Sequence, residues 1–347
     1  MRLIIIGGIA AIALCHAALA QTFEGSDGIE LREVFGTVTI NLENEGPLVV
    51  DLDGPEADAL RLREGRAVSI LGEFDHRDFQ TDLRRAMRKY PNGSNRSERA
   101  FLDMLKERPS LTITAAPGTA IRVVDGAVKL KVRGDAGAVE IEGNSMLLGQ
   151  MDNIETGSVE VIGTGSFRLG NIAGAFDGNV HGSGDLVFDN AGSAQIAVHG
   201  SGDLEGGSIA GDLKASVHGS GDLELGDVGG RVGASVHGSG DLTLGKIGGG
   251  LDASVHGSGD LTAQSVTKSL KVDAHGSGEL DIDGGAVSDL DVQTSGSGEL
   301  RYAGTAINAD LSTGGAGSID VGAVSGQLLA SGKNIRVDGK KVQSNDN

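Results

Sequence analysis

One short unit, His-Gly-Ser-Gly-Asp-Leu, recurs along this 347-residue chain at an almost constant interval. Six copies follow one another in steps of 18, 19, 19, 19 and 19 residues, and the last carries Glu in place of Asp. Their first residues are His181, His199, His218, His237, His256 and His275. Degenerate copies extend the series in both directions. A fixed period of this length is the signature of a solenoid, in which each unit stacks on the next.

Apolar and polar residues alternate within each unit. In the copy that starts at His218, the apolar residues Val217, Leu223 and Leu225 fall on one side and the polar residues on the other. This period of two is typical of a β-strand, and a unit of about 19 residues can bury its apolar side only against its neighbours. A propeller blade would need about 40 residues. We therefore predict an all-β fold, a parallel β-helix with coils about 4.8 Å apart.

The glycines on either side of each serine predict a sharp corner in every coil. At such a corner the inward position has no room for a side chain, and the backbone adopts φ values that favour glycine. The regular coils are expected at 136–335, where no proline interrupts the pattern. Irregular coils that cap the rod are expected at 21–135, and a polar tail at 336–347.

A charged segment at about 76–108 interrupts the irregular coils. Phe79, Leu83 and Tyr90 share one face of a first helix, and a second helix is expected over 97–107 with Asn95 and Glu98 as a capping pair. The sequence therefore predicts a short helical hairpin. Two roles are open for it: a cap over the hydrophobic end of the rod, or an arm that binds a partner, because it is the basic part of an acidic chain.

The first 20 residues have the pattern of a secretory signal peptide. Arg2 supplies the positive start, an apolar run follows, and Ala18-Leu19-Ala20 is typical of a cleavage site, which we expect after Ala20. An uncleaved anchor or a lipoprotein attached through Cys15 is the alternative. The prediction places the protein in the periplasm, on the cell surface or outside the cell.

Composition limits the partners. The formal net charge of -19 repels phosphate backbones, which argues against nucleic acid. The only cysteine is Cys15, so the expected mature chain cannot form a disulfide and depends on packing and hydrogen bonds. No later stretch is long and apolar enough to be an integral membrane segment.

Stacking would align the histidines and the acidic residues of successive units in two columns on the outer face. The candidate binding residues are His199, Asp203, His218, Asp222, His237, Asp241, His256 and Asp260. We expect no catalytic residues, because a Ser-His-Asp site needs one pocket and because side chains two positions apart on a strand lie about 6.6 Å apart. Adjacent carboxylates could instead hold a divalent cation, and calcium or zinc is the possible ion. Otherwise no cofactor is expected.

The units Gly182-Ser-Gly-Asp-Leu186 through Gly296-Ser-Gly-Glu-Leu300 resemble the family DUF2807, described as the "putative auto-transporter adhesin, head GIN domain". The resemblance covers about residues 140–320. It implies a right-handed parallel β-helix, export and no established catalytic residue. The chain departs from an auto-transporter because no run of amphipathic strands for a membrane barrel follows the repeats.

We therefore expect a non-catalytic, adhesin-like binding or scaffold protein of the cell envelope or surface, with a surface protein or a glycan as its partner. A protein that binds divalent cations through the Asp and His columns is the first alternative. A carbohydrate-active enzyme is the second, although the coils have few aromatic side chains to hold a sugar.

Overall fold

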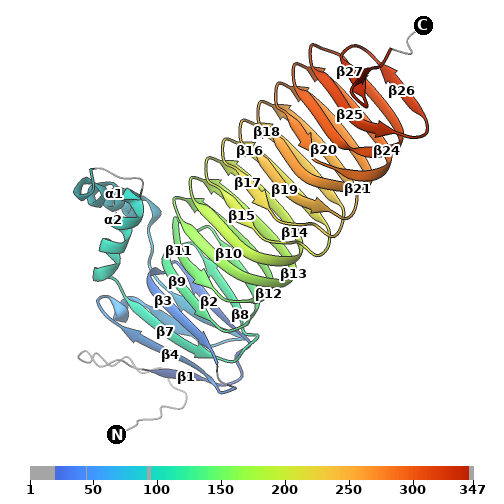
Figure 1. Cartoon of the computed structure of the whole chain (residues 1–347). Helices are drawn as coiled ribbons and strands as arrows, with labels where there is room; N and C mark the ends of the chain where they lie inside the picture. The colour runs from blue at the N-terminus through green and yellow to red at the C-terminus, as the bar shows by residue number, and fades with distance from the viewer. Residues whose placement is uncertain (1–19, 44, 92–94, 344–347) are drawn as a thin grey trace.

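The computed structural model describes residues 20–43, 45–91 and 95–343. Nearly all of the expected signal peptide and the last four residues of the expected tail lie outside this range. The described chain is a rod of about 11 stacked β-coils with a pair of helices on one flank near its N-terminal end (Figure 1). The predicted all-β parallel β-helix with a helical hairpin is confirmed. No helix within the described range is long and apolar enough to cross a membrane.

The regular part of the rod begins at residue 136, and its strands pair in parallel from coil to coil, except that the last strand, β28, pairs antiparallel with β27. The strands are β10 (Ala136–Glu142), β11 (Met146–Met151), β12 (Ile154–Gly163), β13 (Ser166–Gly182), β14 (Asp185–Gly200), β15 (Leu204–Gly206), β16 (Leu213–Gly219), β17 (Leu223–Leu225), β18 (Val232–Gly238), β19 (Leu242–Ile247), β20 (Leu251–Gly257), β21 (Leu261–Gly276), β22 (Leu280–Ile282), β23 (Gly285–Gly296), β24 (Glu299–Thr313), β25 (Ser318–Val324), β26 (Leu328–Ser331), β27 (Ile335–Val337) and β28 (Lys340–Lys341).

The repeated residues align because each coil pairs with the next at the length of one unit. His199 pairs with His218, and His218 with His237. The valine that precedes each histidine points inward, so Val198, Val217 and Val236 form a column with no exposed surface. Leu204 and Leu223 form another inward column on the next side of the coil. The hydrophobic core therefore runs along the rod axis, as period-two alternation requires.

Glycine at the corners is required in two ways. Gly238 has φ +137°, which a side chain rarely allows, and a Cβ atom there would overlap the carbonyl oxygen of Gly219 in the preceding coil. Gly240 lies after the serine, where a Cβ atom would overlap the carbonyl oxygen of Gly221. The first glycine of the pair thus provides the turn and the second provides the close approach between coils.

In the N-terminal part, the order of the strands along the rod differs from their order in the sequence. Its elements are β1 (Gln21–Phe23), β2 (Gly28–Arg32), β3 (Phe35–Leu42), β4 (Leu48–Asp53), η1 (Ala57–Ala59), β5 (Arg61–Arg63), β6 (Ala67–Leu71), α1 (His76–Ala86), η2 (Met87–Lys89), α2 (Arg96–Met104), η3 (Leu105–Glu107), β7 (Ser110–Ala115), β8 (Ala120–Val124) and β9 (Ala127–Arg133). Strands β2 and β3 lie between β6–β7 on one side and β8–β9 on the other. The terminal coil is therefore formed by β6 and β7, and the hairpin is inserted between them.

The hairpin covers the flank of the rod and not its end, which corrects the expectation of a cap over the hydrophobic end. Phe79 and Phe101 pack with Met146 and Leu148, whose side chains point outward from β11. The end itself is covered by antiparallel strands, β4 on β7 with β1 on β4, and β5 on β6. These strands satisfy the backbone groups that a terminal coil would leave unpaired.

The expected capping pair of the second helix is only partly present. Asn95 occupies the N-cap of α2, but its side chain forms no capping hydrogen bond. The first helix has a full cap instead, because the Asp75 carboxylate accepts hydrogen bonds from the backbone N–H groups of Arg77 and Asp78 at 2.8 and 3.0 Å. These bonds hold the pKa of Asp75 below its usual value.

Candidate functional site

The histidine column is a continuous stack of imidazole rings. It is carried by the ends of β13, β14, β16, β18, β20 and β21. Ring centroids lie 4.8 Å apart for His181 and His199, and 4.9 Å apart for His218 and His237, with planes within 6° of parallel. The stack ends at His275, whose ring is tilted by 54° against that of His256. Because the strands pair in register, the spacing of the rings is set by the spacing of the coils.

Serine hydroxyls contact the histidines from an unexpected direction. The Ser235 Oγ lies 3.0 Å from His237 Nδ1, and Ser254 Oγ lies 3.1 Å from His256 Nδ1. These serines precede the histidine by two residues, so the expectation that side chains two positions apart cannot meet is wrong here. The two side chains lean toward each other along the strand, which brings Oγ and Nδ1 within hydrogen-bonding distance.

Burial and neighbouring rings act together on His199. Its pKa is lowered, first because burial disfavours the charged imidazole and then because His181 and His218 lie on either side. Its Nδ1 is buried without a hydrogen-bond partner among the described residues. The neutral ring is therefore the form that this position favours.

The aspartate column connects the coils through the backbone. Asp203 Oδ1 accepts a hydrogen bond from the backbone N–H of Asp222 at 2.9 Å, and Asp222 does the same for Asp241. Asp241 in turn accepts from the N–H of Asp260 at 2.9 Å. Each carboxylate therefore satisfies a backbone donor at the corner of the following coil, which is a structural role for these candidate residues.

The structure brings the predicted residues together as two separate columns. The His and Asp side chains of one unit have different partners, since His237 contacts Ser235 and Asp241 contacts the backbone of Asp260. Among the residues that the structure describes, no group of three or more His, Cys, Asp or Glu side chains is arranged to hold a metal ion. Whether the columns bind a ligand stays a prediction.

Among the residues that the structure describes, Ser, His and Asp side chains meet at one place, the C-terminal end of the histidine stack. His275 Nε2 lies 3.0 Å from Asp273 Oδ1, and its Nδ1 contacts the hydroxyl of Ser295 in the next coil. Ser295 takes the position that a histidine holds in the preceding coils. All three side chains lie on the outer face of the rod, where His275 and Asp273 each have 47% of the side chain exposed.

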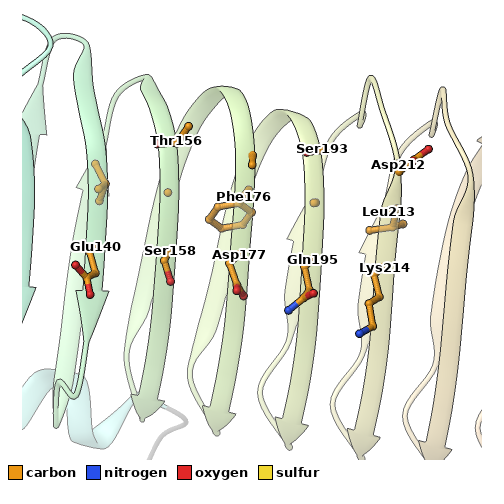
Figure 2. Close-up of a pocket in the computed structure, with 14 residues that line it drawn as sticks. Glu140, Thr156, Ser158, Phe176, Asp177, Ser193, Gln195, Asp212, Leu213 and Lys214 are labelled. Atoms are coloured by element: carbon orange, nitrogen blue, oxygen red, sulfur yellow. The ribbon is translucent and has the colours of Figure 1, made fainter.

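A shallow groove of about 700 Å³ crosses five successive coils, and reasoning from the sequence missed it. Figure 2 shows its polar side chains in a row across neighbouring strands, which are β10, β12, β13, β14 and β16. The row comprises Glu140, Ser158, Asp177, Gln195 and Lys214. Thr156, Ser193 and Asp212 lie above it.

The groove lies where the coils become irregular. The register of the strand pairs shifts between Ile154 and Gly157, and again between Ile172 and Ala175. Gly157 pairs in register with Phe176 of the next coil. Phe176 fills the core there, whereas Gly157 has no side chain to fill the same position in its own coil. The step of 18 residues from His181 to His199 was the available signal in the sequence, because a coil that lacks one residue must change its path.

Comparison with known proteins supports the resemblance over part of the chain. Residues 250–337, about a quarter of the sequence, match the family DUF2807, "putative auto-transporter adhesin, head GIN domain". No curated protein matches the chain.

Solved structures with a similar course of the chain include a "putative adhesin" from Bacteroides fragilis, with 16% identity, a TM-score of 0.35, and coverage of 84% of this chain and 100% of that chain. A second "putative adhesin", from Parabacteroides distasonis, has 12% identity, a TM-score of 0.30 and coverage of 92% and 96%. A "putative lipid binding protein" from the same organism has 16% identity, a TM-score of 0.28 and coverage of 91% and 97%. These likenesses are too weak to carry an argument about this chain.

Proposed function

We propose that this protein is a non-catalytic, adhesin-like scaffold of the cell envelope or surface, and that the groove on β10 to β16 binds an extended glycan. The observation that supports this is the row of polar side chains that crosses successive coils. The row advances by one coil, about 4.8 Å, at each step. This spacing is close to the length of one pyranose ring in an extended chain, so one sugar could lie over each coil.

The side chains of the row suit sugar hydroxyls. Gln195 provides both a donor and an acceptor, Asp177 provides acceptors, and Lys214 provides donors. Asp177 is held in place by a hydrogen bond from Asn179 Nδ2 to its Oδ1 at 2.7 Å. An acceptor that is already held in place loses less conformational entropy when a ligand binds, which favours affinity.

The test is the binding of purified cell-wall polysaccharides to residues 20–347, measured by isothermal titration calorimetry. The double variant Asp177→Ala/Gln195→Ala should weaken binding by about tenfold, since each lost hydrogen bond contributes roughly 0.5–1.5 kcal/mol. Thr243→Ala/Thr262→Ala, an exposed pair on another side of the rod, is the matched control and should bind like the wild type.

Three outcomes would oppose the proposal. Absence of binding to every polysaccharide tested would reject the glycan, and equal binding by both double variants would reject the groove. Release of new reducing ends during the incubation would favour the carbohydrate-active enzyme instead.

The hypothesis of a divalent-cation protein needs a separate measurement. Thermal unfolding with EDTA, calcium or zinc tests it, because a cation that binds only the folded rod stabilises it by about 2.7 kcal/mol at 100 times its dissociation constant. A shift that Asp222→Asn and Asp241→Asn remove would place the cation on the Asp column. Equal melting temperatures in all three solutions would reject this hypothesis.

A further inference from the structure

The hairpin carries a stripe of three exposed arginines. Arg77, Arg84 and Arg88 are exposed, and their spacing of seven and four residues places them on one side of α1 and the turn that continues it. The opposite side holds Phe79 and Leu83, which are buried against the rod. None of the three arginines forms an ion pair with any residue in the described part of the chain, whereas the neighbouring Arg85 pairs with Asp82.

Hydrogen bonds hold the two helical segments of the hairpin together. At its tip, the Tyr90 hydroxyl donates a hydrogen bond to Asp103 at 2.6 Å, and Arg96 Nε donates one to the backbone oxygen of Tyr90 at 2.5 Å. Lys106 also donates to Asp103, and the two side-chain hydrogen bonds, that from Lys106 first, lower the pKa of Asp103 to about 2. The Asp103 carboxylate therefore stays ionised and links the end of the first helical segment to the second helix.

The rod carries the opposite charge. Residues 136–335 hold 26 Asp and Glu but only eight Lys and Arg, whereas residues 76–107 hold eight Lys and Arg and five Asp and Glu. On β15 and β17, Glu205 and Glu224 are exposed and directly adjacent in register. Neither glutamate forms a salt bridge with a described residue, and like charges placed side by side are destabilising.

We infer that the arginine stripe of one molecule docks on this carboxylate face of a second copy. The carboxylate face runs over four successive coils and comprises Asp203, Glu205, Asp222, Glu224, Asp241 and Asp260, all of them exposed. Along a helix, Arg77 and Arg84 are about 10.5 Å apart and Arg84 and Arg88 about 6 Å, which correspond to steps of two coils and one coil. Guanidinium groups at this spacing can each reach a carboxylate of a different coil.

The contact joins different surfaces of the two copies. In Figure 1 the hairpin projects sideways near the N-terminal end, and β15 and β17 lie farther along the rod. When the stripe of one copy binds the carboxylate face of another, the first copy still has a free face and the second a free stripe. Further copies can therefore add at both ends, and the association is open-ended. It is also weak and sensitive to salt, because exposed ion pairs contribute little and are screened.

The test is sedimentation velocity of residues 20–347 at high protein concentration in low and high salt. The wild type should associate at low salt and be monomeric at high salt. Arg77→Glu/Arg84→Glu/Arg88→Glu should lower the association constant by about tenfold to 100-fold. Arg63→Glu/Lys340→Glu/Lys341→Glu makes the same change of net charge at exposed positions elsewhere and should leave association nearly unchanged.

A charge swap identifies the second surface. Glu205→Lys/Glu224→Lys should also prevent self-association, and its mixture with the triple Arg→Glu variant of the hairpin should associate again, because the swapped charges complement each other. A wild type that stays monomeric at low salt, equal effects of the two triple variants, or a mixture that stays monomeric would each overturn the inference. Monomeric protein that binds anionic lipid vesicles through the three arginines would assign the stripe to phosphate headgroups instead.

Discussion

The same outward column of the rod is covered in one region and exposed in another. Leu148, Ser166 and Asp185 occupy equivalent positions in successive coils, since each pairs with the next in register. Leu148 is buried under the hairpin, whereas the aspartates that continue the column from Asp203 face solvent. The strands pair in parallel with their neighbours in both regions. The outward side chain therefore decides whether a coil carries another element or presents a polar surface.

The largest effect is expected from placing a charge in the covered region. Leu148→Asp leaves an unpaired carboxylate under Phe79 and Phe101, which should destabilise the hairpin by about 3–5 kcal/mol. Limited proteolysis within the hairpin measures this, with circular dichroism to show that the rod remains folded. Ser166→Asp, one coil farther on in the exposed column, is the control and should change little. If the hairpin of Leu148→Asp resists proteolysis as well as that of the wild type, the contrast between the covered and the exposed part of the column is wrong.

The exposed region should be sensitive at its corners and tolerant along its strands. Gly238→Ala introduces a Cβ atom at φ +137° against the preceding coil and should lower stability by about 1–3 kcal/mol. Gly233→Ala in the same strand meets no atom within 4 Å, so it should be neutral or slightly stabilising. Denaturant unfolding of both variants checks this. Equal midpoints would show that the corner glycines are not required.

The hydrogen bonds of the aspartate column predict a smaller effect. Asp222→Ala removes the acceptor for the backbone N–H of Asp241, which should destabilise the rod by about 0.5–1.5 kcal/mol. Asp222→Asn keeps an acceptor and should lose less. Glu224→Ala removes a side chain that forms no hydrogen bond with a described residue, so its stability should stay within about 0.5 kcal/mol of the wild type. Thermal unfolding separates the three, and a loss as large for Glu224→Ala as for Asp222→Ala would contradict the structural role.

The smallest effect concerns pH. The pKa of His199 is lower in the folded rod than in the unfolded chain, so the unfolded chain binds more protons as the pH falls below about 6.5. This contribution to stability is fully present above that pH and is lost as the pH falls toward the lowered pKa. His199→Gln should reduce the loss of stability on acidification. If melting temperatures measured between pH 7.5 and 5 fall equally in variant and wild type, His199 is not responsible.

The repeated part of the fold could be predicted in detail because each coil forms the same contacts. The valines, leucines and corner glycines of the units that begin at His199 and His218 lie where the alternation placed them. The groove could not be predicted, since it depends on how an 18-residue step and Gly157 change the path of neighbouring strands. The meeting of His275, Asp273 and Ser295 was also missed, because Ser295 belongs to another coil.

The sequence by itself determined the coil. Period-two alternation, the constant unit length and the corner glycines leave stacked parallel strands as the way to bury the apolar side of each unit. Only the tertiary structure decided what each outward column does. Met146 and Leu148 receive the hairpin because the chain inserts it between β6 and β7 and folds it back over later coils. That contact joins residues far apart in the sequence, and no local pattern specifies such a pairing.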